Sequence, residues 1–122
     1  MKLEIINNAI SLVIETCESM FPEAKDAVIF FTGPENAGAA GYTTQNEKGE
    51  WIVGINDEIP YNAVPEIIAH EVAHIVKESR NPSQNPSEEH NEEWEKLFED
   101  IQVEFMRRAK ELGEKIKEEG RL

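Results

Sequence analysis

Residues 65–79 read PEIIAHEVAHIVKES, and within them His70-Glu71-Val72-Ala73-His74 forms an HExxH pentapeptide. A helix is predicted over this stretch. Four residues make about one helical turn, so the two imidazoles project from one face and can share one metal ion. The glutamate lies at the flank of that pair, where its carboxylate can accept a proton from water that the metal activates. The alternative interpretation is an acidic helix with two incidental histidines.

Two histidines do not complete a catalytic zinc site, which needs a third protein ligand and one position left for water. His90 is the last of the three histidines in the chain. It is expected one turn before Trp94 on the apolar face of the final helix, pointing inward. Glu93 is the rival, because its separation from the pentapeptide matches the gluzincin aminopeptidases, whose third ligand is a carboxylate. Glu93 could instead hydrogen-bond a ligand imidazole, and Glu89 is expected to be solvated.

Three strands and an N-terminal helix are predicted before this stretch. Apolar residues recur at three- and four-residue intervals from Leu3 to Met20, which predicts one face of an amphipathic helix. Residues 27–32 are apolar and rich in β-formers, so a buried strand is expected there. Residues 42–45 and 51–55 flank a turn at 46–49 that ends in glycine, the pattern of an antiparallel hairpin.

Prolines mark the boundaries of the two later helices. Pro65 suits a first helical turn, where its missing N–H costs nothing, and the helix should end near Ser79 before a proline-punctuated loop. A long last helix is predicted to run towards Glu119, with its N-cap, N1 and N3 positions at Asn85, Pro86 and Glu88. The expected fold is α+β. A small, mainly antiparallel three-stranded sheet is packed by the N-terminal helix, the HExxH helix and the long C-terminal helix, in a single domain 1–122.

Composition narrows the class of partner. Twelve basic and 25 acidic side chains give a formal charge of −13, which repels nucleic acids and anionic lipid heads and favours neutral or cationic partners. Cys17 is the one cysteine, so neither an internal disulfide nor a cysteine zinc ribbon is possible, and it is expected in the core. Neither a secretory h-region nor an apolar run of membrane-spanning length is present, so a cytoplasmic protein is expected, without a membrane partner.

The two histidine blocks together resemble the SprT-like zinc metallopeptidases. HEVAH is followed, after a variable loop, by His90-Asn91-Glu92-Glu93-Trp94. In that family the second block is typically His-Gly-x-x-aromatic; the aromatic position is filled here, and asparagine stands where glycine is usual. Residues 40–42 and 51–56 also resemble the strands that precede the family's active-site helix. The likeness covers roughly residues 27–101, and its histidine motifs are the specific part.

This resemblance implies a zincin-like fold with His70, His74 and His90 as ligands of one Zn²⁺ per chain. It also implies Glu71 as the catalytic base for hydrolysis of peptide bonds in an extended or unfolded polypeptide. Two features depart from better-known members. The chain has no C-terminal cysteine ribbon, and its acidic charge argues against the DNA-linked role of the Spartan proteases.

Two classes of function remain open. In a zinc endopeptidase, Tyr42 and Tyr61 are candidates, by residue type only, for a second group that stabilises the oxyanion. If Trp51–Ile55 forms a sheet edge beside the cleft, an extended peptide could add to it as another strand; an ordinary core strand is the alternative. The second class is a zincin-fold regulatory or binding protein, such as an ImmA/IrrE-like factor, which expects a Glu or Asp third ligand, or a catalytically silent zinc domain.

Overall fold

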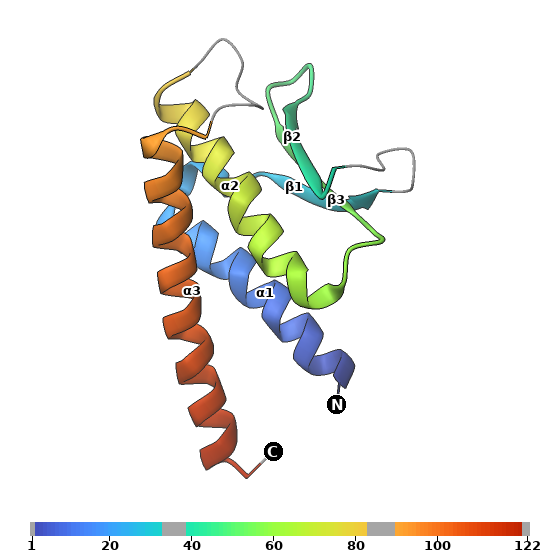
Figure 1. Ribbon diagram of the computed structural model, residues 1–122, viewed down its shortest axis with the longest axis vertical. Coiled ribbons are helices and arrows are strands. Elements are labelled where there is room, and N and C mark those ends of the chain that lie inside the picture. The colour runs from blue at the N-terminus through green and yellow to red at the C-terminus, as the bar shows by residue number, and fades with distance from the viewer. Residues whose placement is uncertain (1, 33–38, 83–89, 121–122) are drawn as a thin grey trace.

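The computed structural model describes residues 2–32, 39–82 and 90–120. It has the predicted α+β class, with three helices and a three-stranded sheet (Figure 1). In Figure 1 the sheet lies beside α2, and α3 runs along the other side of α2 and past α1. The elements in chain order are α1 (Lys2–Met20), the 3-10 turn η1 (Pro22–Ala24), β1 (Val28–Thr32), β2 (Gly41–Gln45), β3 (Trp51–Asn56), the 3-10 turn η3 (Tyr61–Ala63), α2 (Val64–Arg80) and α3 (Glu92–Glu118).

The sheet is mixed, which corrects the prediction of a mainly antiparallel one. Its strand order is β1-β3-β2, with β1 parallel and β2 antiparallel to β3. The sequence pattern identified each strand, but the direction of β1 depends on how the chain returns to the sheet, which local periodicity does not encode. Trp51–Asn56 is therefore the central strand. The suggestion that Trp51–Ile55 forms an edge for an added peptide is wrong, because both sides of β3 already have partners.

The β2–β3 hairpin is confirmed with its glycine-ended turn. The Asn46 side-chain oxygen accepts hydrogen bonds from the backbone N–H groups of Lys48 and Glu50, both at 2.9 Å. Gly49 has φ of +81°, a left-handed conformation that side chains with a Cβ rarely adopt. This turn sets the register in which Thr43 lies opposite Val53, so the faces of β2 follow from it.

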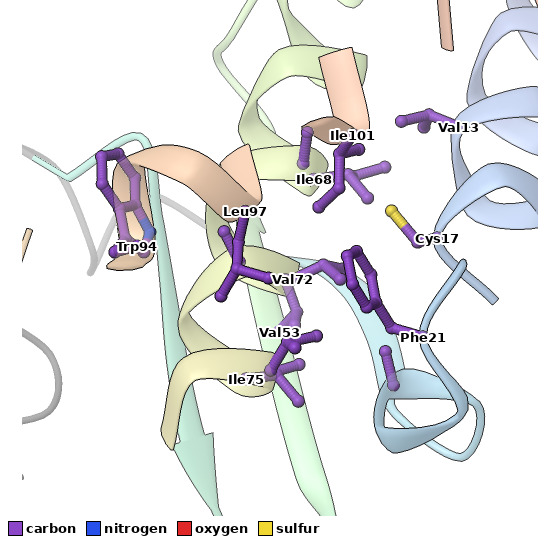
Figure 2. Packing of buried hydrophobic residues seen from close by; sticks show 14 of the residues in the cluster. Val13, Cys17, Phe21, Val53, Ile68, Val72, Ile75, Trp94, Leu97 and Ile101 are labelled. Atoms are coloured by element: carbon purple, nitrogen blue, oxygen red, sulfur yellow. The ribbon is translucent and has the colours of Figure 1, made fainter. Parts of the chain in front are cut away.

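The core forms around α2, which packs against the sheet and against α1 and α3. Figure 2 shows side chains from α1, β3, α2 and α3 meeting in one cluster. Cys17 belongs to it, as predicted, and burial raises the pKa of its thiol to about 12, so the thiol is an apolar packing group. Side chains of α1 are described from Ala9 onward, so Leu3 and Ile6 of the predicted apolar face lie outside the description. Among the described helices, none is both long and apolar enough to cross a bilayer.

α2 and α3 begin in different ways. Pro65 lies in the first turn of α2, as predicted from its missing N–H. For α3, the predicted cap residues Asn85, Pro86 and Glu88 lie outside the described residues. The described helix begins at Glu92, and Asn91 is its N-cap, with the side-chain oxygen accepting a 2.9 Å hydrogen bond from the backbone N–H of Trp94.

Candidate metal centre

The first half of the site is the helical pair in α2. His70 and His74 project from neighbouring turns, with ring centroids 5.0 Å apart. His70 is half-buried, whereas His74 is only 4% exposed. Burial lowers the pKa of both imidazoles below the ordinary histidine value, for His74 to about 4, and the neighbouring histidines lower both further. Both rings are therefore neutral at pH 7 and have a lone pair available for a metal.

His90 completes a cluster with this pair. Its Nε2 lies 3.0 Å from Nε2 of His74, and its ring centroid is 4.9 Å from that of His70. One ligand atom from each of the three rings lies within 4.8 Å of the others. The structure therefore brings together the three histidines that the sequence singled out.

The way in which His90 reaches the cluster differs from the prediction. It precedes α3 in non-helical backbone, and it is exposed rather than turned into the apolar core. Its ring stacks on Trp94, with centroids 4.2 Å apart and an interplanar angle of 23°. The prediction that His90 lies on a helical face one turn before Trp94 is wrong, because α3 begins only after the N-cap at Asn91, which follows His90. Stacking, instead of a helical face, directs the imidazole towards α2.

These residues fit a zinc-type ion. Nε2 of His74 and Nε2 of His90 are 3.0 Å apart, and one ligand atom from each of the three imidazoles lies within 4.8 Å of the others, so all three could hold one ion together. Three protein ligands would leave one coordination position for water, as in catalytic rather than structural zinc sites. Nδ1 of His74 is buried and has no hydrogen-bond partner among the described residues, so Nε2 is its nitrogen aimed into the cluster.

Trp94 connects the two halves of the site. Its indole N–H donates a 3.3 Å hydrogen bond to the backbone oxygen of His70, and its ring centroid lies 4.8 Å from that of His70. Phe98, one turn further along α3, stacks on Trp94 and meets the His70 ring edge-on at 5.7 Å. An aromatic wall on α3 therefore shields one side of the cluster and holds α3 against α2.

Glu71 lies on the opposite flank, between α2 and the sheet. The residue is 5% exposed, and Oε1 accepts a 2.7 Å hydrogen bond from the Thr43 hydroxyl of β2. Oε2 lies 3.7 Å from Nε2 of His70, so this oxygen faces the cluster. Burial raises the pKa of Glu71, and the hydrogen bond from Thr43 opposes that increase. A buried carboxylate with a raised pKa is suited to accept a proton near neutral pH.

The sequence did not identify Thr43. Strand alternation alone places Gly41 and Thr43 on one face of β2, but which face turns towards α2 depends on the pairing register. The register puts them level with Ile55 and Val53, the buried side of β3. A hydroxyl two residues from a glycine in a strand before the HExxH helix was the available signal, and it is weak.

The remaining candidates lie elsewhere. The Glu93 carboxylate accepts a 3.2 Å hydrogen bond from the Asn81 amide and is not part of the histidine cluster. Glu89 lies outside the described residues. The Tyr42 ring meets Phe30 on the face of β2 opposite to Thr43, with centroids 6.4 Å apart. Tyr61 is exposed in η3, before α2 begins. Neither tyrosine is placed beside the three imidazoles.

Comparisons with known proteins complete the description of the site. No protein-family model, no curated protein and no solved structure was found to match this chain. The site itself consists of three converging imidazoles and a buried carboxylate with one oxygen turned towards them.

Proposed function

We propose that the chain is a zinc-dependent metallopeptidase of the SprT-like kind, with His70, His74 and His90 as the metal ligands and Glu71 as the general base. The observation that supports this proposal most is the 3.0 Å distance between Nε2 of His74 and Nε2 of His90, which lie 16 residues apart in sequence. If the two helical histidines were incidental, the third histidine of the chain would not be expected to lie beside them. The open coordination position and the adjacent carboxylate favour a catalytic site over a structural one.

The chemistry divides between the metal and Glu71. When bound, zinc supplies a Lewis acid that acidifies water and polarises a carbonyl oxygen. Oε2 of Glu71, on the side of the cluster, accepts a proton from the attacking water and then delivers it to the leaving amine nitrogen. Trp94 and Phe98 exclude water from one side of the histidines, and Trp94 holds His90 by stacking.

The substrate that suits this arrangement is an extended or unfolded polypeptide. β2 is paired with β3 on one side, and no other described strand pairs with it, so its second edge can accept an added strand. This edge belongs to the strand that carries Thr43 beside Glu71. A peptide bond held there would lie along the flank of the site. The net charge of −13 favours neutral or basic segments and disfavours nucleic acid.

The test combines metal analysis with one substitution. Protein purified without chelators should contain about one zinc per chain and cleave an unfolded, fluorescently labelled polypeptide. Glu71→Gln should keep the zinc and lose about 10²–10⁴-fold in cleavage rate, the usual contribution of a general base. Glu99→Gln, at an exposed position of α3, is the matched control and should change neither quantity.

Each failure has a separate meaning. Protein without zinc would overturn the whole proposal. Stoichiometric zinc without cleavage, or equal cleavage by wild type and Glu71→Gln, would overturn the peptidase and leave a zinc-binding or regulatory domain.

A further inference from the structure

We infer that Thr43 is a positioning residue for Glu71: it holds one carboxylate oxygen and thereby turns the other towards the three histidines. This inference deepens the proposed peptidase function and rests on it. Thr43 belongs to β2 and Glu71 to α2, 28 positions apart in sequence, so the contact depends on how the sheet packs against the helix.

The two oxygens of Glu71 have different environments. Oε1 lies 2.7 Å from the Thr43 hydroxyl, whereas Oε2 lies 3.7 Å from Nε2 of His70. The same hydroxyl is 3.4 Å from the backbone oxygen of Glu71, but it has one proton to donate, and the 2.7 Å contact has the geometry of a strong O–H···O⁻ bond. The hydroxyl therefore identifies Oε1 as the anchored oxygen and leaves Oε2 free to act as the base.

The strand is built to bring this hydroxyl within reach. Gly41 and Thr43 share the face of β2 that turns towards α2. A Cβ at position 41 would lie 2.9 Å from Cγ2 of Ile67 and 3.6 Å from Cγ of Glu71. The absence of a side chain at Gly41 thus allows β2 to lie close against α2. Since Thr43 is β-branched, its χ1 angle is restricted, which limits the directions that the hydroxyl can take.

A positioning role follows from the freedom that the hydrogen bond removes. Glu71 has three rotatable side-chain bonds, and a general base must hold its oxygen within hydrogen-bond reach of the proton that it accepts. Losing an outer hydrogen-bond partner of such a site typically costs about 10–100-fold in activity. A merely structural contact would instead change folding stability and leave the rate per folded molecule intact.

The experiment compares Thr43→Val, Thr43→Ser and Thr44→Val. Valine has nearly the shape of threonine without the hydroxyl, serine restores the hydroxyl, and Thr44 is exposed on the opposite face of the same strand. For each variant, zinc content, kcat and KM on the unfolded polypeptide, and a crystal structure are obtained. Thr43→Val should lower kcat about 10–100-fold, with KM and zinc content within about threefold of wild type. Thr43→Ser should recover most of the loss, and Thr44→Val should match wild type.

The crystal structures separate this inference from the proposed function. In Thr43→Val the Glu71 carboxylate should leave its wild-type orientation or become disordered, whereas Thr43→Ser should retain it. If wild type cleaves nothing, the peptidase proposal fails, but the orientation of Glu71 still tests whether Thr43 controls it. An unchanged carboxylate in Thr43→Val, or an unchanged kcat in an active enzyme, would overturn the positioning role. If Thr43→Val does not fold, the test rests on Thr43→Ser, which should then match wild type in kcat and in the orientation of the Glu71 carboxylate.

Discussion

His90 is held in a different way from the other two histidines of the cluster. His70 and His74 are fixed by one helix, so their relative positions follow from helical geometry. His90 stands in non-helical backbone and is exposed, and the contacts that orient it are stacking on Trp94 and the 3.0 Å approach to His74. Its neighbour Glu93 points to Asn81 instead. At the scale of residues, the identity of the third ligand is therefore the decisive question.

Substitution of His90 and of Glu93, one at a time, identifies the third ligand. His90→Ala should weaken zinc binding by more than the 10–100-fold that loss of an outer hydrogen-bond partner typically causes, because it removes a ligand itself. Glu93→Ala should leave zinc affinity within about threefold, since its carboxylate bonds Asn81. Competition titration with a chromophoric zinc chelator measures both. The reverse outcome would make the third ligand a carboxylate, as in the gluzincins.

At the scale of elements, the start of α3 determines where His90 and Trp94 lie. Asn91 caps the helix by accepting a hydrogen bond from the Trp94 N–H, and the backbone oxygen of Asn91 accepts one from the Glu95 N–H. The helix thus begins between His90 and the tryptophan that stacks on it. Asparagine is among the residues most favoured at an N-cap, and glycine is favoured there less strongly.

The cap can be tested by substitution at one position. Asn91→Ala should lower the free energy of unfolding by about 1 kcal/mol, whereas Asn91→Gly should cost only a few tenths of that. Urea denaturation of the metal-free proteins measures both. Asn91→Ala should also weaken zinc binding, because a frayed first turn releases His90 and Trp94 together. Equal stability of the alanine variant and wild type would show that the cap contributes nothing.

Most of the elements could be predicted from local pattern. The extents of α1 and α2, the β2–β3 hairpin and the long α3 follow from apolar periodicity, proline positions and a glycine-ended turn. The parallel pairing of β1 and the central place of β3 could not be predicted in this way, because strand order depends on which apolar faces meet in three dimensions. The N-cap predicted at Asn85 lies outside the described residues, and the cap at Asn91 was not predicted.

At the scale of the whole molecule, burial of the site links its protonation to global stability. The folded protein lowers the pKa of His74 from 6.5 to about 4, mainly by burial and then through His70 and His90. The unfolded chain therefore binds this proton more tightly than the folded protein does. Above pH 6.5 the His74 imidazole is neutral in both states and does not lower the free energy of unfolding. As the pH falls towards 4, the unfolded chain binds a proton that the folded protein does not, so the free energy of unfolding decreases and then levels off.

This linkage predicts that metal-free protein loses about 3 kcal/mol of unfolding free energy between pH 6.5 and 4 through His74. Glu71 acts in the opposite direction, because its raised pKa lets the folded state bind a proton first as the pH falls. Comparison with His74→Gln isolates the histidine contribution. Urea denaturation in chelator across this range should show wild type losing stability relative to the glutamine variant. Parallel pH profiles would contradict the burial of a neutral His74.

Local sequence spacing was enough to predict the part of the candidate site that lies within one helix. His70, Glu71 and His74 lie within about one turn, so helical geometry fixes their relative positions once the helix forms. The long-range contacts depend on packing: His90 reaches the pair from outside a helix, and the Thr43 hydroxyl donates a hydrogen bond to Glu71. Those contacts depend on strand register, on the approach of β2 to α2 and on the stacking of Trp94. Each of these is a property of packing between distant segments, which local sequence spacing does not contain.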